Sequence, residues 1–307
     1  MRKTSTYILI TLLLFASLFA CEKEQAKEIS LSQDEIIPTP PNSEQDGTII
    51  RIAIAAIISP RETFSYYEEF LSQLSKKMGA EIKLIQRKNY AEINNLVEAG
   101  KIDVAFVCSG AYVDGHNEFG MELLVAPQAY GEPYYYSYII VPSDSDVTKL
   151  ADLKGKKFAF TDPMSNSGKL APTYLLSKMN ETPNSFFSKH IFTYSHDKSI
   201  EAVAQKLVDG AAVDSLIWEY ANAVDPTFTK KTKVILKSAP FGIPPVVVAK
   251  DIDPKLKKEL KEVFLNMHFD KNSKPILDKL HIDKFIIVED SAYNSIREMK
   301  EFINDQK

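Results

Sequence analysis

Cysteine is almost absent from this chain of 307 residues, which contains only Cys21 and Cys108. With Cys21 close to the N-terminus, we expect no intrachain disulfide in the folded body, so a large apolar core must stabilise it. After residue 20 no stretch is long and apolar enough to span a membrane. The formal net charge is only -4, and the lysines are scattered among acidic residues, which argues against a nucleic-acid surface.

Motifs of the common hydrolases and redox proteins are also missing. The sequence contains no HExxH, no GxSxG and no CxxC. We therefore expect a binding protein and not an enzyme, and we expect no cofactor, no metal and no nucleic-acid partner.

The N-terminus carries the pattern of a secretory signal. Arg2 and Lys3 precede an apolar run from Tyr7 to Ala20 that is short for a bilayer span. The run ends in Leu-Phe-Ala-Cys, which resembles a bacterial lipobox, in which the cysteine is lipidated. We expect residues 1–20 to be a lipoprotein signal peptide and Cys21 to be the lipidation site. An uncleaved anchor helix and a signal without lipidation are the alternatives.

Residues 21–47 differ in composition from the rest of the chain. They are polar and acidic and contain Pro38, Pro40 and Pro41. Such a segment cannot bury enough apolar area to offset its ordering entropy. We expect a flexible tether with a reach of about 25–30 Å.

From residue 50 onward, short apolar strands alternate with amphipathic helices in two successive series. The first series has strands expected at 50–57, 82–85 and 102–107, and the second has strands expected at 157–162, 190–195 and 211–215. This repeated order predicts an α/β fold of two lobes with parallel-type sheets.

The stretch DPMSNSGKLAP (162–172) follows a predicted strand and opens a predicted helix. Ligands of open α/β sheets bind at the carboxyl ends of strands. Ser165, Asn166 and Ser167 would add hydroxyl and amide donors to the free N–H groups of the first helical turn, and Gly168 would leave the backbone open to a ligand. This pattern indicates a site for a phosphate-like anion. An ordinary helix N-cap is the alternative.

Four longer segments carry a family resemblance. They are DLKGKKFAFTDPMSNSGKLAPTYLL (152–176), KIDVAFVCSGAYV (101–113), YSHDKSIEAVAQKLVDGAAVDS (194–215) and KSAPFGIPPVVVAK (237–250). In order and spacing the chain resembles the phosphonate/phosphite substrate-binding proteins of ABC transporters from residue 49 to about 270.

The resemblance implies a type II periplasmic-binding-protein fold, with two lobes, a double crossover and hinge closure over the ligand. We expect one lobe to comprise 48–138 and 245–307, and the other 139–244. We expect the hinge near 139–142 and 234–246.

The same resemblance assigns roles to residues of the expected cleft. Ser165, Asn166 and Ser167 would hold the oxygens of the anion, and His196 would donate to one of them. Asp214 would meet a protonated oxygen or an amino substituent. The family pattern has threonine where this chain has Asn166, so the preferred anion is left open.

Three further residues are expected to line the cleft. Tyr136 is the tyrosine of the run 134–136 assigned to it, and Tyr112 and Ser109 would belong to the wall of the first lobe. His196 and Asp214 have alternative roles as helix caps.

These features together predict an extracytoplasmic, monomeric solute-binding lipoprotein. It would capture a small oxyanion, deliver it to an ABC transporter permease, and be lipid-anchored to the bacterial cell membrane, on its periplasmic face or at the cell surface. Delivery of the signal to a sensor kinase is one alternative. A ferric-iron site made by tyrosines with His196 and Asp214 is another, and a Ser-His-Asp hydrolase site is the weakest.

Overall fold

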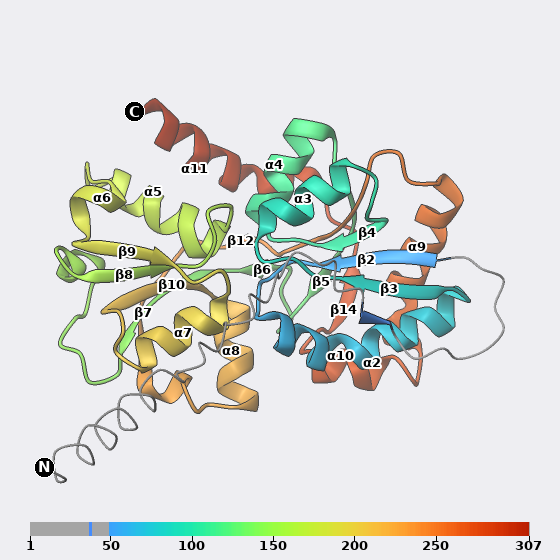
Figure 1. Ribbon diagram of the computed structural model, residues 1–307, viewed down its shortest axis with the longest axis horizontal. Coiled ribbons are helices and arrows are strands. Elements are labelled where there is room, and N and C mark those ends of the chain that lie inside the picture. Colours follow the sequence, from blue (N-terminus) through green and yellow to red (C-terminus); the bar gives the residue numbers. More distant parts are fainter. Residues whose placement is uncertain (1–36, 39–48, 307) are drawn as a thin grey trace, which may run out of the picture. The chain divides into compact units, whose positions relative to one another are not determined.

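The computed structural model describes residues 37–38 and 49–306, which all belong to one compact unit, 36–307 (Figure 1). The predicted signal peptide, Cys21 and most of the predicted tether lie outside the described residues. Within that tether, Ile37–Pro38 form strand β1, which pairs antiparallel with β3 (Glu81–Ile85). Across the described residues, no helix is both long and apolar enough to cross a bilayer.

The first sheet has seven strands in the order β1-β3-β2-β4-β13-β5-β14. The remaining members are β2 (Ile49–Ile54), β4 (Val104–Phe106), β5 (Glu122–Gln128), β13 (Val246–Val248) and β14 (Lys284–Ile286). Strands β3, β2 and β4 are parallel, whereas β13, β5 and β14 pair antiparallel.

The second sheet has five strands in the order β11-β7-β10-β8-β9. They are β7 (Ser137–Pro142), β8 (Lys157–Phe160), β9 (Lys189–Phe192), β10 (Gly210–Asp214) and β11 (Thr232–Lys237). Strands β10, β8 and β9 are parallel, and β7 and β11 are antiparallel to their neighbours. The predicted α/β fold with two lobes is confirmed, and the sheets are mixed, with parallel pairing confined to these two sets of three strands.

The chain passes between the sheets twice, which is the predicted double crossover. The crossing segments contain β6 (Tyr134–Tyr135) and β12 (Phe241–Gly242), which pair with each other. Residues 139–142, near which the hinge was predicted, lie inside β7, which pairs with β10 on one edge and β11 on the other, and the hinge position stays a prediction.

Helices cover both faces of each sheet (Figure 1). Those of the first sheet are α2 (Pro60–Met78), α3 (Tyr90–Glu98), α4 (Ser109–Phe119), α9 (Pro254–Asn266), α10 (Lys274–Lys279) and α11 (Asn294–Asp305). Those of the second are α5 (Ala171–Ser177), α6 (Pro183–Phe186), α7 (His196–Ala204) and α8 (Ser215–Val224). Single turns connect them at Leu150–Leu153, Asn166–Leu170, Thr229–Lys231, Met267–Phe269 and Asp290–Tyr293.

Separate apolar cores lie on the two faces of each sheet, as the alternation of strand side chains requires. Phe70 of α2 is fully buried, and its ring centroid lies 5.8 Å from that of Phe106 at the end of β4. This packing fixes the ends of the strands in the first sheet. It thereby positions the polar loops that follow those ends.

Candidate functional site

The segment 162–168 is fixed by its own hydrogen bonds. Asp162 is buried, and its carboxylate accepts from the Met164 N–H at 2.8 Å and from the Tyr90 N–H at 3.1 Å. Ser165 Oγ accepts from the Gly168 N–H at 3.0 Å, so Ser165 is an N-cap as the alternative interpretation predicted. The helix then begins with a π turn at Asn166–Leu170 and continues as α5.

Two glycines make close approaches around this segment. A Cβ on Gly110 would lie 2.4 Å from the Met164 carbonyl oxygen, so glycine lets the start of α4 approach residues 164–166. A Cβ on Gly168 would lie 2.5 Å from Thr161 Oγ1. The expectation that Gly168 leaves room for a ligand is wrong, because Thr161 fills that space.

Three buried polar atoms at this site have no hydrogen-bond partner within the described part of the chain. They are Tyr90 Oη, Asn166 Oδ1 and Ser167 Oγ. The other end of the Asn166 amide is engaged, because Nδ2 donates to Tyr135 Oη at 2.9 Å. Most buried polar groups in folded proteins are paired, so this grouping of orphaned atoms indicates a place built for a polar ligand.

His196 is a neutral residue in this site. Its Nδ1 accepts from the Asp214 N–H at 3.0 Å and lies 3.1 Å from Thr161 Oγ1. Burial lowers the pKa of His196 to about 3. Since Nδ1 acts as an acceptor, the ring proton is on Nε2, which makes His196 a neutral donor.

Asp214 ends β10 and caps α8. Its Oδ1 accepts from the Leu216 N–H at 2.8 Å, and only 2% of the residue is exposed. Burial raises the pKa of Asp214 to about 7, against the opposing effect of backbone hydrogen bonds from Leu216 and Ile217. The carboxyl group therefore exchanges a proton near neutral pH.

Two tyrosines that the sequence analysis did not assign complete this site. Tyr90 is the first residue of α3 and interacts electrostatically with Asp162, Asp214 and Tyr135. Burial raises the pKa of Tyr90 and Tyr135 well above the ordinary value, so both are neutral phenols. The available signal for Tyr90 was its position just after a strand of the first sheet. We call the following residues the cradle: Tyr90, Tyr135, Asn166, Ser167, His196 and Asp214.

The other predicted residues make contacts of a different kind. The ring of Tyr136 lies 3.6 Å below the ammonium of Lys237, and Tyr135, not Tyr136, contacts Asn166. Tyr112 Oη donates to Asp290, which is not a cradle residue, at 2.7 Å. Ser109 Oγ donates to the Gly242 carbonyl at 2.7 Å and also interacts with the Tyr135 hydroxyl.

Loops of the two sheets contact each other directly beside the cradle. The His196 N–H donates to the Ile57 carbonyl at 2.9 Å. The Ser59 N–H donates to the Asp197 carboxylate at 3.0 Å. The Asp162 bond to the Tyr90 N–H is a third such link. These bonds join residues that follow strands of different sheets.

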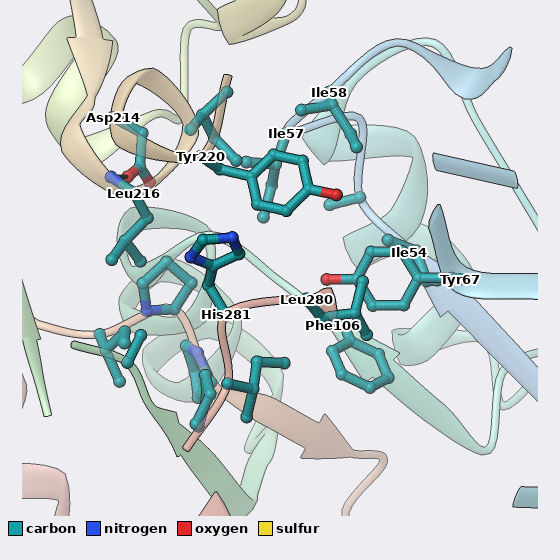
Figure 2. A pocket seen from close by; sticks show the side chains of 18 of the residues that line it. Ile54, Ile57, Ile58, Tyr67, Phe106, Asp214, Leu216, Tyr220, Leu280 and His281 are labelled. Carbon is teal, nitrogen blue, oxygen red and sulfur yellow. Dashed lines mark hydrogen bonds between the residues drawn. The ribbon is translucent and has the colours of Figure 1, made fainter. Parts of the chain in front are cut away.

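A cavity of about 140 Å³ adjoins the cradle (Figure 2). Its lining comes from the loops after β2 and β4, from the start of α8 and from the crossing segment at Ile243–Pro245. Figure 2 shows Tyr67, Tyr220 and His281 pointing into the same space, with Leu216 and Asp214 at one side. The lining is mainly apolar and aromatic, in contrast to the cradle.

The described residues contain no group of three or more His, Cys, Asp or Glu side chains placed to hold a metal ion. Ferric iron would require tyrosinate ligands, whereas the raised pKa values of Tyr90 and Tyr135 favour the neutral phenols. The site is better suited to a ligand that accepts hydrogen bonds.

Comparison with known proteins identifies the family of the chain. Residues 52–293 match the family described as ABC transporter, phosphonate, periplasmic substrate-binding protein. The phosphonates-binding periplasmic protein of Escherichia coli (strain K12) is 27% identical over 271 residues, covering 86% of this chain and 79% of that protein. The phosphate-import protein PhnD of Mycolicibacterium smegmatis is 33% identical over 193 residues, covering 58% and 60% respectively.

A solved structure has the same fold. The binding-protein component of an ABC phosphonate transporter from Pseudomonas aeruginosa superimposes with a TM-score of 0.80 at 27% identity, covering 85% of this chain and 88% of that chain. The family match extends over most of the chain and over both sheets. The chain therefore belongs to the family of periplasmic substrate-binding proteins of phosphonate ABC transporters.

Proposed function

We propose that this protein binds a small phosphorus oxyanion, a phosphonate, phosphite or phosphate, between its two lobes and delivers it to an ABC importer. The observation that carries the proposal is the set of orphaned buried atoms Tyr90 Oη and Ser167 Oγ beside Asn166. Leaving a buried donor unpaired costs about 1–3 kcal/mol. A bound anion would satisfy these donors.

Asn166 can complete the set by a change of amide orientation. With its amide turned over, Oδ1 would accept from the Tyr135 hydroxyl, and Nδ2 would become a donor for the ligand. The cradle would then present donors from Tyr90, Asn166, Ser167 and His196 without a lysine or arginine among its members. Recognition by neutral donors favours a defined geometry of oxygens over bulk negative charge.

Asp214 gives this cradle a way to distinguish among anions. Beside the ligand its carboxylate repels an oxyanion unless one of the two carries a proton. Monoanionic phosphonate and phosphate carry a P–OH proton that Asp214 can accept, whereas sulfate carries none at neutral pH. Asp214 is ionised above its raised pKa of about 7, and in that pH range the proposed preference is for protonated phosphorus oxyanions over sulfate.

The lobes proposed for ligand capture are 48–138 with 245–307, and 139–244. Bonds such as His196 N–H to the Ile57 carbonyl join loops of the two sheets beside the cradle, and such links would form as the lobes close. The paired crossing strands β6 and β12 are the proposed pivot. We propose that the protein acts as a monomer.

The remaining parts of the proposal concern location. Lipidation of Cys21 after removal of residues 1–20 would keep the protein at the outer face of the cell membrane, near the permease. Replacing Cys21 with serine should release the protein from the membrane fraction or leave the precursor uncleaved. Unchanged processing and attachment would overturn the lipoprotein assignment.

The binding proposal is tested by calorimetry with phosphate, phosphite, methylphosphonate and sulfate. We expect heat of binding with at least one phosphorus oxyanion and a much weaker response to sulfate. Ser167→Ala should weaken binding, whereas Ser273→Ala should not. Ser273 is a matched control because it is equally buried and bonds Asp270 at 2.8 Å in another part of the fold. Absence of binding to all three phosphorus oxyanions would reject the proposal.

A further inference from the structure

We propose that helix α11 is a brace between the two lobes. In this brace, the contact of Phe302 with Tyr174 of α5 stabilises the closed arrangement and thereby raises the affinity for every anion that binds. Phe302 acts through the lobes and not on the ligand, which makes it a positioning residue. This inference rests on the proposed function, because ligand affinity is the quantity that the brace changes. It goes further by giving a role in binding to a helix outside both the cradle and the cavity.

Helix α11 is anchored to the first lobe along most of its length. Ile296 and Met299 are buried in the core cluster that also contains Val247 of β13. Lys300 Nζ donates to the Asp114 carboxylate of α4 at 2.5 Å. These contacts fix the helix to the first lobe as far as Lys300, so its last turn moves together with that lobe.

The last turn of α11 contacts the second lobe, and α11 lies beside α5 in Figure 1. The ring centroids of Phe302 and Tyr174 are 5.2 Å apart with an interplanar angle of 77°, an edge-to-face pair. Helix α5 is anchored to the second lobe, because Leu176 is fully buried in the core cluster that contains Phe158 of β8. The aromatic pair therefore joins two bodies that the proposed closure moves relative to each other.

Helices α5 and α11 also meet close to the crossing strands. Ala171, at the start of α5, is buried in the same core cluster as Ile296 and as Tyr135 and Phe241 of β6 and β12. Phe302 follows Ile296 by six residues, which is about 9 Å along a helix. A rotation about the crossing strands displaces distant contacts more than near ones. We therefore expect opening to weaken the contact of Phe302 while the contact of Ala171 changes less.

Beyond Phe302 a groove of about 650 Å³ separates α11 from the second lobe. Ile303 lines it from α11, and Ser177 and Pro183 line it from the other side. The pair formed by Phe302 and Tyr174 thus lies at the outer edge of the contact between the lobes, and both side chains are only partly buried. Substitutions at this edge can weaken the contact without opening a cavity in the core of either lobe.

The closed arrangement brings the cradle together from both lobes. Tyr90 belongs to the first lobe, whereas Asn166, Ser167 and His196 belong to the second. Helix α11 also contacts the turn that contains Asn166 and Ser167. A contact that is strong in the closed arrangement and weak in the open one shifts the equilibrium toward closure. Its loss should lower the affinity for each anion by the same factor, because the population of the binding-competent state falls.

Calorimetry on Phe302→Ala with phosphate, phosphite and methylphosphonate tests the brace. Losing the edge-to-face pair should lower the affinity about three- to tenfold, equally for each of these anions that binds. Phe302→Leu keeps an apolar side chain and should lose less affinity than Phe302→Ala. Phe228→Ala is the control, because Phe228 is also partly buried but packs on the core of the second sheet. Its affinity should be unchanged.

Hydrogen exchange of the ligand-free protein gives a second readout. The N–H groups of His196 and Tyr90 donate across the lobes, to the Ile57 carbonyl and the Asp162 carboxylate. Both amides should exchange about three- to tenfold faster in Phe302→Ala, because the closed arrangement is less populated. Amides inside β7 and β10 should exchange at unchanged rates. A purely structural role of Phe302 would increase exchange in α11 and α5 alone.

The outcomes separate this inference from the proposed function. If Phe302→Ala binds as tightly as the unmodified protein or more tightly, and exchange at His196 and Tyr90 is unchanged, the brace is wrong and the oxyanion site stands. A loss of affinity for one anion alone would also overturn the brace, since it would indicate a direct effect on that ligand. If no phosphorus oxyanion binds the unmodified protein, the proposed function fails, and hydrogen exchange alone decides whether α11 braces the lobes.

Discussion

The cradle and the cavity are neighbours at the same strand ends. The side chains of the cradle are polar, whereas those of the cavity are mainly apolar. In the cradle the groups are polar and buried, and Tyr90 Oη and Ser167 Oγ have no partner in the described structure. In the cavity the surface is mainly apolar, and Ile54 and Phe106 also belong to the core of the first sheet. The difference teaches that one region contains buried polar groups without partners, for which we propose an anion, whereas the other is an extension of the core.

The cradle and the cavity should contribute differently to the stability of the free protein and to ligand affinity. We expect a cradle residue with an orphaned hydroxyl to reduce the stability of the free protein and to gain a partner only when the proposed ligand binds. A cavity residue stabilises the free protein through packing and adds affinity only for ligands that enter the cavity. Substitutions in the two regions should therefore be separable by measuring melting and binding on the same variants.

The largest effect is expected from removing both orphaned hydroxyls. Tyr90→Phe combined with Ser167→Ala deletes two donors to a charged ligand, each worth about 1.5–3 kcal/mol. Affinity for methylphosphonate should fall at least about a hundredfold, while the melting temperature of the ligand-free protein should be unchanged or higher. Calorimetry and thermal melting check the two parts. A lower melting temperature with unchanged affinity would mean that these hydroxyls have structural partners.

From the sequence, part of the cradle could be predicted, but the cavity could not. DPMSNSGKLAP could be assigned to an anion site because its polar run lies at a strand end, a position that topology alone makes a ligand site. His196 and Asp214 were assigned to the same site by the family resemblance. Tyr90 and Tyr135 were not, since one begins an ordinary amphipathic helix and the other lies in a run of three tyrosines whose orientation depends on the crossing strands.

The cavity could not be predicted at all. Its lining combines common core residue types from segments as distant as Ile54 and His281, and no local pattern distinguishes such residues from those that fill the core. The fold could be predicted more fully, since hydrophobic periodicity indicates the two series of strands and helices. The antiparallel pairing of β13 and β5 was missed, because periodicity does not report strand direction.

A second prediction concerns proton binding in the cradle. Burial raises the folded-state pKa of Asp214 to about 7 from 3.8. The folded protein then binds a proton more tightly than the unfolded chain, so the Asp214 contribution to stability is fully present below about pH 4 and is lost as pH rises through about 7. Asp214→Asn keeps a side-chain oxygen that can cap α8, and it removes the loss of stability at higher pH.

The variant should be about 2–4 kcal/mol more stable than the unmodified protein at pH 8, with little difference at pH 4. His196 contributes to the pH dependence of stability with the opposite sign, because its lowered pKa of about 3 costs stability as pH falls from 6.5. This contribution is the same in both proteins, so it cancels in the difference between them. Denaturant unfolding from pH 4 to pH 8 measures this difference. A constant offset across that range would show that Asp214 does not titrate as proposed.

A third prediction tests the close approach of α4 to the cradle. Gly110→Ala would place a Cβ 2.4 Å from the Met164 carbonyl oxygen, and this backbone atom has to move. Overpacking of this kind costs about 1–3 kcal/mol. Since Asn166 follows two residues later, affinity for methylphosphonate should fall together with stability. Full affinity with normal melting would show that residues 164–166 adjust without affecting the anion site.

Ser165 should give a smaller and mixed result. Its Oγ accepts from the Gly168 N–H, so Ser165→Ala removes an N-cap worth about 1 kcal/mol. The same hydroxyl retains a proton to donate, which allows a contribution to anion binding as well. We expect melting to decrease by an amount typical of a lost cap, with affinity reduced less than in Ser167→Ala. An equal loss of affinity in both single variants would place Ser165 fully in the cradle.

The smallest effect is expected outside both regions, at Tyr112. The sequence assigned Tyr112 to the wall of the cleft, but its hydroxyl donates to Asp290 at 2.7 Å, and Arg297 contacts the same carboxylate oxygen at 2.5 Å. Asp290 is partly exposed, so this bond should contribute about 1 kcal/mol or less. Tyr112→Phe should therefore lower the melting temperature slightly and leave the affinity for methylphosphonate unchanged. A tenfold loss of affinity without a change in melting would instead support the role that the sequence assigned to Tyr112.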